Sequence, residues 1–220
     1  MKREIITTGD GSKTIQLTDW EEQYHSVHGA VQEAYHVFIK HGLDLFQNSP
    51  IHILEIGFGT GLNAFITLLE AQKRKLRVNY CGVEGFPVLW EEAKQLDYPL
   101  KLDVLDCKPI FELMHTSVWE KEIEIASNFT LIKKSKDFQD INEQEMFNLI
   151  YFDAFGARVQ PELWTVAIFK KMFNALKSEG YLVTYAAKGS VRRAMQEVGF
   201  LVERLPGPPG KREMLRARKP

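Results

Sequence analysis

The chain has 220 residues, of which 45% are hydrophobic and 26% are charged, and its formal net charge is −1. These values are typical of one globular α/β domain with additions, and they exclude a protein that binds nucleic acid through overall positive charge. The sequence has no apolar run of the roughly 18 residues that a membrane helix needs, no signal peptide, and no disulfide or metal-ligand spacing. We therefore expect a reduced, cytoplasmic protein that binds no metal and does not enter a membrane. Its oligomeric state is not predicted.

Residues 1–50 are predicted to form an N-terminal extension that packs on a core of residues 51–220. Two candidate strands, residues 4–8 and 13–17, flank a glycine-rich turn and indicate a β-hairpin. A helix is predicted over residues 31–41. The polar and aromatic segment before it contains Tyr24 and is positioned to close over a binding site.

The core is organised around residues 51–63 (IHILEIGFGTGLN). Residues 51–56 read as a buried parallel strand, and apolar residues recur at helical spacing from Leu62 onward. The glycines between them allow a sharp turn and the close approach of a ligand. A glycine loop between strand and helix predicts a nucleotide-like ligand at the carboxyl edge of a doubly wound sheet.

The spacing of the glycines argues against a dinucleotide. The dinucleotide fingerprint is G-x-G-x-x-G, whereas here the third glycine comes one place early. Glu55, two residues before the loop, suits a cationic ligand better than a pyrophosphate. The pattern resembles the first motif of class I S-adenosylmethionine (SAM)-dependent methyltransferases, which implies SAM as the cofactor. The motif residues that the resemblance assigns to the cofactor site are Glu55, Gly57, Phe58, Gly59, Gly61 and Asn63.

Two further acids follow predicted strands. Glu84 ends the strand predicted over residues 77–84, where a carboxylate can accept hydrogen bonds from ribose hydroxyls. NAD and SAM share that ribose, so Glu84 does not choose between them. Asp137 follows the strand that begins at Phe129, and class I methyltransferases often hold the adenine amino group with an acid there.

The second half of the chain continues the alternation of strands and helices. A strand over residues 147–152 places Asp153 at its carboxyl end. Next come a helix over residues 161–176, a strand over 180–187 and a helix over 191–198 capped by Ser190. A terminal hairpin follows. This order predicts a Rossmann-like class I methyltransferase fold: a seven-stranded, mostly parallel sheet with helices on both faces.

Three stretches besides the glycine loop are more distinctive: residues 151–155 (YFDAF) with 161–164 (PELW), residues 189–200 (GSVRRAMQEVGF) and residues 210–215 (GKREML). They resemble the methyltransferase domain of the bacterial bifunctional tRNA 5-methylaminomethyl-2-thiouridine biosynthesis protein MnmC and its single-domain relatives. The resemblance implies methylation of an aminomethyl group on the tRNA wobble uridine, without the oxidase domain of the bifunctional form. One departure is Ala154, where the family usually has glycine.

Methyl transfer to an amine requires a free lone pair on nitrogen. An alkylammonium has a pKa of roughly 10, and an ordinary aspartate near 3.9 is a poor base for it. We therefore expect Asp153 to orient the amine and to stabilise charge more than to abstract a proton. Phe155 is a candidate to stack on the uracil or to line the pocket.

Basic residues toward the C-terminus are candidates for tRNA contacts, because phosphates attract such a surface and a wobble base can be splayed out of its loop. The candidate substrate-binding residues are Tyr24, Phe155, Lys188, Arg192, Lys211 and Arg212. Two other functions remain open: a class I methyltransferase acting on a small amine or a protein, and a non-catalytic nucleoside-binding module. A NAD-dependent oxidoreductase is a weaker third reading.

Overall fold

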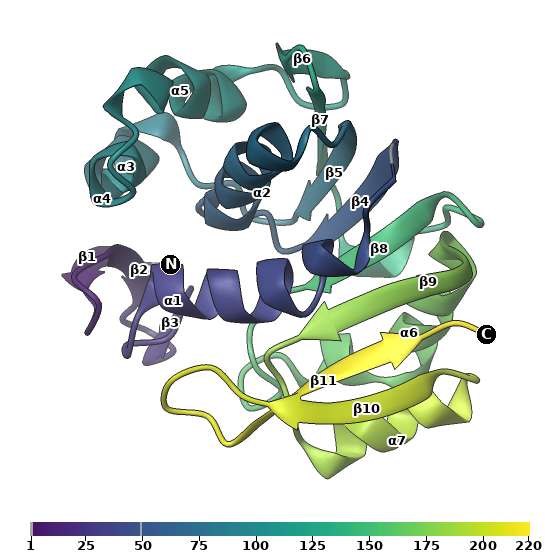
Figure 1. Ribbon diagram of the computed structural model, residues 1–220. Coiled ribbons are helices and arrows are strands. Elements are labelled where there is room, and N and C mark those ends of the chain that lie inside the picture. The colour runs from purple at the N-terminus through teal and green to yellow at the C-terminus, as the bar shows by residue number, and fades with distance from the viewer. Residues whose placement is uncertain (1, 49) are drawn as a thin grey trace.

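An eight-stranded sheet forms the centre of the computed structural model, which describes residues 2–48 and 50–220 (Figure 1). The strand order is β10-β11-β9-β8-β4-β5-β7-β6. The strands are β4 (Ile51–Ile56), β5 (Val78–Glu84), β6 (Ile123–Ala126), β7 (Phe129–Ser135), β8 (Phe147–Phe152), β9 (Leu176–Thr184), β10 (Leu201–Pro206) and β11 (Glu213–Arg218).

Strands β9, β8, β4, β5 and β7 pair in parallel, and β11 lies antiparallel between β9 and β10. The predicted seven-stranded, mostly parallel sheet is therefore confirmed. The eighth strand, β6, pairs antiparallel with β7 at one edge. It was not predicted, because it has only four residues and a break in register between Glu124 and Ala126 leaves no regular alternation.

Helices cover both faces of this sheet. The helices are α1 (Ala30–Ala34), α2 (Leu62–Arg74), α3 (Trp90–Ala93), α4 (Tyr98–Lys101), α5 (Lys108–Thr116), α6 (Val166–Ala175) and α7 (Gly189–Glu197). Ile53 of β4 packs in the apolar cluster with α1, α2 and α5, whereas its neighbour Leu54 packs in the cluster with α6 and α7. Successive side chains of a strand point to opposite faces, so a strand covered on both faces is mostly apolar.

The N-terminal segment forms a separate small sheet of β1 (Arg3–Thr7), β2 (Lys13–Leu17) and β3 (Glu22–Gln23). The predicted hairpin is confirmed, and α1 continues as a π-helix over Tyr35–Lys40. Long side chains tie this segment to the core: Arg3 pairs with Glu92 at 2.9 Å, and Arg158 pairs with Glu22 at 2.8 Å. The division into an extension and a core at residues 50 and 51 stays a prediction, and Met1 and Ser49 lie outside the described residues.

Two of the helix predictions were wrong in detail. The helix predicted over residues 161–176 is a 3-10 turn, Pro161–Trp164, followed by α6. Thr165 separates the two because its backbone is extended and its side chain accepts a hydrogen bond from the N–H of Ile168. Ser190 does not cap α7, since the N-cap residue is Lys188 and makes no side-chain cap.

Candidate active site

A cavity of about 770 Å³ opens at the carboxyl edge of the parallel strands. The glycine loop, the end of β5 and the segment after β7 line part of it. The remaining walls come mainly from residues 22–28, 153–158, 185–188 and 210–213, together with Glu33 of α1. The N-terminal segment and the β10–β11 loop therefore complete the site. In Figure 1 this yellow loop extends toward the purple N-terminal segment.

Gly57 and Gly59 of the glycine loop have a left-handed backbone, and the space at Gly57 admits no side chain. Gly57 has φ +90°, and a Cβ there would lie 2.6 Å from the carbonyl oxygen of Asp153. Gly59 has φ +48°, and its N–H donates a 2.9 Å hydrogen bond to Glu84 Oε2. The other oxygen of Glu84 accepts from the N–H of Phe86 at 2.8 Å. Glu84 therefore fixes the loop while still lining the cavity.

Phe58 points away from the cavity and supports the loop from beneath. It is buried, and it packs on Gly82 of β5 so closely that a Cβ there would lie 2.4 Å from Phe58 Cδ2. His115 and Trp119 surround the same ring. Phe58 is thus a packing residue of the loop in this structure. Gly61, also outside the cavity lining, is the left-handed residue that begins α2.

Asn63 joins two acids of the site. Its Nδ2 donates to Glu55 Oε1 at 2.9 Å and to Asp153 Oδ2 at 2.8 Å. Glu55 is fully buried, and burial raises its pKa well above the usual range, with Asp153 adding to the effect. Glu55 therefore lies beneath the cavity as an acid whose proton is bound more tightly than usual, and it does not line the cavity wall.

Asp153 lines the cavity, and its pKa is raised to about 7. Burial is the main cause, and the negative charge of Glu33 adds to it. The hydrogen bond from Asn63 and the charge of Lys211 act in the opposite direction. Asp153 is therefore a stronger base than the ordinary aspartate assumed from the sequence.

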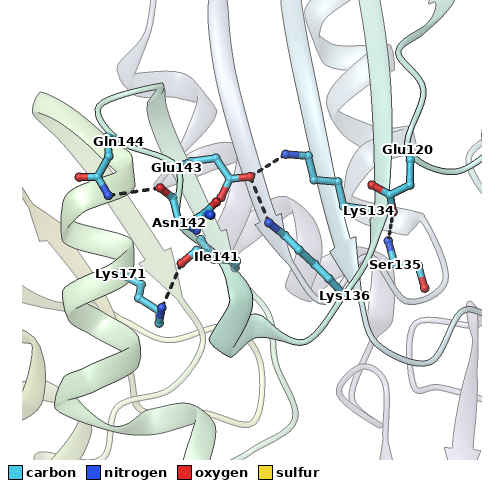
Figure 2. Close-up of polar contacts among 9 residues, drawn as sticks. All are labelled: Glu120, Lys134, Ser135, Lys136, Ile141, Asn142, Glu143, Gln144 and Lys171. Carbon is cyan, nitrogen blue, oxygen red and sulfur yellow. Dashed lines mark hydrogen bonds and ion pairs between the residues drawn. The ribbon is translucent and has the colours of Figure 1, made fainter.

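Asp137 begins the short 3-10 helix Phe138–Asp140 and accepts a hydrogen bond from the N–H of Gln139 at 2.8 Å. Figure 2 shows what holds this segment: Glu143 pairs with Lys134 at 2.6 Å and with Lys136 at 3.2 Å. Burial raises the pKa of Glu143, but the hydrogen bond and the charge of Lys134, together with backbone hydrogen bonds, outweigh it and lower the pKa to about 2. The segment after β7 is thereby fastened where Lys136 and Asp137 line the cavity.

The backbone after Asp153 is held by two aromatic side chains. Tyr185 donates from its hydroxyl to the carbonyl of Ala154 at 2.8 Å, and Trp164 donates from Nε1 to the carbonyl of Phe155 at 2.8 Å. Ala154 does not adopt the left-handed conformation, so alanine is accommodated without strain. Phe155 meets Tyr24 edge to face, with ring centroids 4.9 Å apart. These aromatic rings form a wall against which a flat base can stack.

Lys211 lies inside the cavity. Its ammonium pairs with Glu33 of α1 at 2.5 Å and lies 3.9 Å from the centroid of the Tyr185 ring. Lys188 and Arg212 are exposed at the cavity, whereas Arg192 is not part of its lining. Among the residues described, Lys188 and Arg212 have no acidic partner within 4 Å.

The C-terminal basic residues are less available than the sequence indicated. Arg204, Arg216, Arg218 and Lys219 each pair with a glutamate that comes from a partner strand or a distant loop. In the sequence after residue 203, Glu213 is the only acid near these basic residues. Their other partners, residues 145, 179 and 203, lie earlier in the chain. The basic surface is therefore confined to fewer residues around the cavity.

The structure brings most of the expected site residues to one cavity: Tyr24, Gly57, Gly59, Glu84, Asp137, Asp153, Phe155, Lys188, Lys211 and Arg212. Glu55, Phe58, Gly61, Asn63 and Arg192 do not line it. Sequence reasoning missed Glu33 and Tyr185. Glu33 looks like an ordinary acid in a helix, and Tyr185 like one more aromatic residue of a strand. No local pattern marks either residue.

Within residues 2–48 and 50–220, no group of three or more His, Cys, Asp or Glu side chains is arranged to hold a metal ion. No helix in the same residues is long and apolar enough to cross a membrane.

The chain is similar to known methyltransferases in sequence and in structure. The sequence model of an S-adenosyl-L-methionine-dependent methyltransferase family matches residues 113–220. The crystal structure of MnmC2 from Aquifex aeolicus superposes with a TM-score of 0.75 at 26% identity, covering 98% of this chain and 70% of that one. The chain resembles the MnmC methyltransferases over nearly its whole length. The fold predicted from the sequence is thereby confirmed, and the match to the family model supports the predicted SAM-dependent methyltransferase class.

Two bifunctional MnmC proteins are similar to this chain in sequence. The bifunctional MnmC protein of Idiomarina loihiensis is 28% identical over 216 residues, which is 90% of this chain and 36% of that protein. The MnmC protein of Hydrogenovibrio crunogenus is 27% identical over 234 residues, 97% of this chain and 33% of that protein. The chain thus spans about a third of the length of these relatives. Spermidine synthase from Thermotoga maritima, at 11% identity and a TM-score of 0.53, shares the fold alone.

Proposed function

We propose that this chain transfers a methyl group from SAM to the nitrogen of 5-aminomethyluridine, or its 2-thio form, at the wobble position of tRNA. We propose that the protein is bacterial and acts in the cytoplasm. The observation that carries it is Asp153, a cavity acid with a pKa of about 7 that is held by Asn63 beside the glycine loop. The similarity to MnmC proteins, whose name refers to this modified tRNA base, supports the substrate.

The residues present fit SAM. Gly57 and Gly59 leave space for close approach, Glu84 places a carboxylate on the cavity wall, and Asp137 is an exposed acid on the same wall. We propose that these four residues hold the cofactor, with Glu55, Phe58, Gly61 and Asn63 supporting the loop from outside the cavity. When bound, SAM supplies a methyl group whose bond to a sulfonium sulfur breaks, with its electron pair going to sulfur, as the new N–C bond forms.

The protein must supply a neutral amine. Transfer of a proton from an ammonium of pKa about 10 to an ordinary aspartate is uphill by about 6 units, or about 8 kcal/mol. Transfer to Asp153, with its pKa of about 7, is uphill by only about 3 units, or about 4 kcal/mol. Asp153 thus has the proton affinity to accept one ammonium proton and then to orient the nitrogen lone pair through a hydrogen bond. This proposal gives Asp153 a larger role as base than its sequence indicated.

The remaining walls suit a nucleobase at the end of a nucleic acid loop. Tyr24 and Phe155 offer aromatic faces for the uracil, and base–aromatic stacking contributes about 1–3 kcal/mol per base. Exposed Lys188 and Arg212 at the same cavity are placed for contacts with the phosphates of the anticodon loop. Arg192 lies outside the lining, and we propose for it a contact farther along the tRNA.

The test is transfer of a labelled methyl group from SAM to tRNA carrying 5-aminomethyluridine, with SAM affinity measured separately. We expect Asp153→Asn to bind SAM and to lose at least about tenfold in rate, about 1.4 kcal/mol in the barrier. Asp106→Asn, an exposed aspartate distant from the cavity lining, is the matched control and keeps full activity.

The outcomes separate the alternatives. If SAM binds and a small amine or a protein is labelled while tRNA is not, the chain is a methyltransferase with another substrate. If SAM binds and nothing is labelled, the chain is a nucleoside-binding module, and Asp153→Asn changes nothing measurable.

A further inference from the structure

Glu33 is an acid inside the cavity that the methyl transfer itself does not need. It is 5% exposed, and both carboxylate oxygens have partners: the N–H of Ser26 donates to Oε1 at 3.0 Å, and Lys211 donates to Oε2 at 2.5 Å. Glu33 belongs to α1 and Lys211 to the β10–β11 loop, 178 residues away. This ion pair therefore joins the two segments that complete the cavity wall.

The pair holds the Lys211 ammonium in a defined place. The ammonium lies 3.9 Å from the centroid of the Tyr185 ring, and the hydroxyl of Tyr185 is hydrogen-bonded to the carbonyl of Ala154. Lys211 forms no ion pair with Asp153, the neighbour of Ala154. A lysine is long and flexible, so the position of its ammonium depends on which of the neighbouring acids holds it.

We propose that Glu33 is a positioning residue: it fixes the Lys211 ammonium over the Tyr185 ring and so keeps that charge from neutralising Asp153, whose carboxylate is left to receive the cationic amine of the substrate. The substrate half of this statement rests on the proposed function. The positional half concerns charges of the protein alone and can be measured without substrate.

The charges around Asp153 come from several elements. Glu55 on β4 and Tyr80 on β5 lie beneath it, and both have strongly raised pKa values because of burial. Tyr185 after β9 is also buried with a raised pKa. The charges that shift the pKa of Asp153 are those of Glu33, which raises it, and of Lys211, which lowers it. The two partners of one ion pair thus act on Asp153 with opposite sign.

Because Glu33 and Lys211 shift the pKa of Asp153 in opposite directions, their substitutions should also shift it in opposite directions. A purely structural role of Glu33 would not produce this result. In Glu33→Gln, a negative charge is lost and the Lys211 ammonium is released, so the pKa of Asp153 falls by about 0.5 to 1 unit. In Lys211→Met, the charge of Glu33 is left uncompensated, so the pKa of Asp153 rises by a similar amount. The double variant has neither charge and returns toward the wild-type value. Glu22→Gln, which breaks the ion pair with Arg158 at the same cavity, leaves Asp153 unchanged.

The measurement is a ¹³C NMR titration of the Asp153 carboxyl carbon in the protein without ligand, with the signal assigned by its loss in Asp153→Asn. Opposite shifts in the two single variants support the proposal, whereas no shift or shifts of the same sign overturn it. If Glu33→Gln does not fold, Lys211→Met on the loop still tests the sign. The acid limb of the pH–rate profile for tRNA methylation is followed in parallel and moves the same way.

The two readouts keep the proposals distinguishable. Opposite NMR shifts without methyl transfer to tRNA would overturn the proposed function alone. Methyl transfer with an unchanged NMR titration would overturn the role of Glu33 alone.

Discussion

Asn63 Nδ2 lies 2.8 Å from Asp153 Oδ2, although 90 residues separate the two along the chain. The same amide nitrogen donates to Glu55 at 2.9 Å, so one side chain supplies hydrogen to both acids. A hydrogen bond to a carboxylate favours its charged form and thus limits the rise in pKa that burial causes. Asn63 therefore acts on the carboxylate of Asp153 without lining the cavity.

We predict that Asn63→Ala raises the pKa of Asp153 and reduces methyl transfer at pH 7 by about tenfold or more, because a lost hydrogen bond to a charged group costs about 1.5–3 kcal/mol. The acid limb of the pH–rate profile should move to higher pH. The measurement is kcat/KM from pH 5 to 9. Asn142→Ala, an exposed asparagine outside the cavity, serves as control, and an unmoved acid limb in Asn63→Ala would contradict the prediction.

Asp153→Asn should stabilise the protein while it removes activity. The folded-state pKa of Asp153 is raised to about 7 from a usual value of 3.8, so the folded state binds the proton more tightly than the unfolded state does. Below pH 3.8 both states are protonated and this residue costs nothing. As pH rises from about 4 to 7 the unfolded chain ionises first, so the free energy of unfolding falls.

The loss amounts to at most about 1.36 kcal/mol per unit of pKa shift, and contact with cavity water reduces it. We therefore expect the melting temperatures of wild type and Asp153→Asn to coincide near pH 4 and to diverge by several degrees at pH 8, with the variant more stable. Thermal unfolding at both pH values measures this. A variant that is less stable at pH 8 than wild type would argue against the raised pKa.

Gly82→Ala should damage the cofactor site from beneath. The added Cβ would lie 2.4 Å from Phe58 Cδ2, and Phe58 supports the glycine loop. Overpacking of this kind costs about 1–3 kcal/mol, and we expect weaker SAM binding together with a lower melting temperature. The matched control is Gly85→Ala three residues on, where the nearest atom is 4.0 Å away. Equal effects of the two substitutions on melting temperature would show that Phe58 yields freely.

Lys188→Ala and Arg212→Ala should each weaken tRNA binding and lower the slope of log K against log salt by about 0.7 to 0.9, the value for one phosphate contact. SAM affinity should not change. Arg216→Ala is the control, because this arginine is already bonded to Glu203 at 2.7 Å and lies outside the cavity. Filter binding between about 50 and 200 mM salt measures the slope for each cavity variant and for the control. A slope that falls only in Arg216→Ala would place the tRNA elsewhere.

The sequence predicted those parts of the fold that depend on local pattern. Strand β4 has the predicted limits, Ile51 and Ile56, because its four apolar residues mark a strand covered on both faces and a glycine loop ends it. The helix predicted over residues 161–176 was wrong because Thr165 has an extended backbone and caps a new helix by accepting a hydrogen bond from the N–H of Ile168. Short edge strands such as β6 carry too few residues for a recognisable period.

By itself, the sequence determined the order of strands and helices, the glycine loop, and the acids at the strand ends, including Glu84 and Asp153. These follow from periodicity and from the geometry of parallel sheets, in which strand ends meet at one edge. Only the tertiary structure decided the ionisation of the site. The raised pKa of Asp153 and the pairing of Lys211 with Glu33 depend on burial and on charges brought together from opposite ends of the chain. Electrostatic interactions act through space, so no local pattern in the sequence records them.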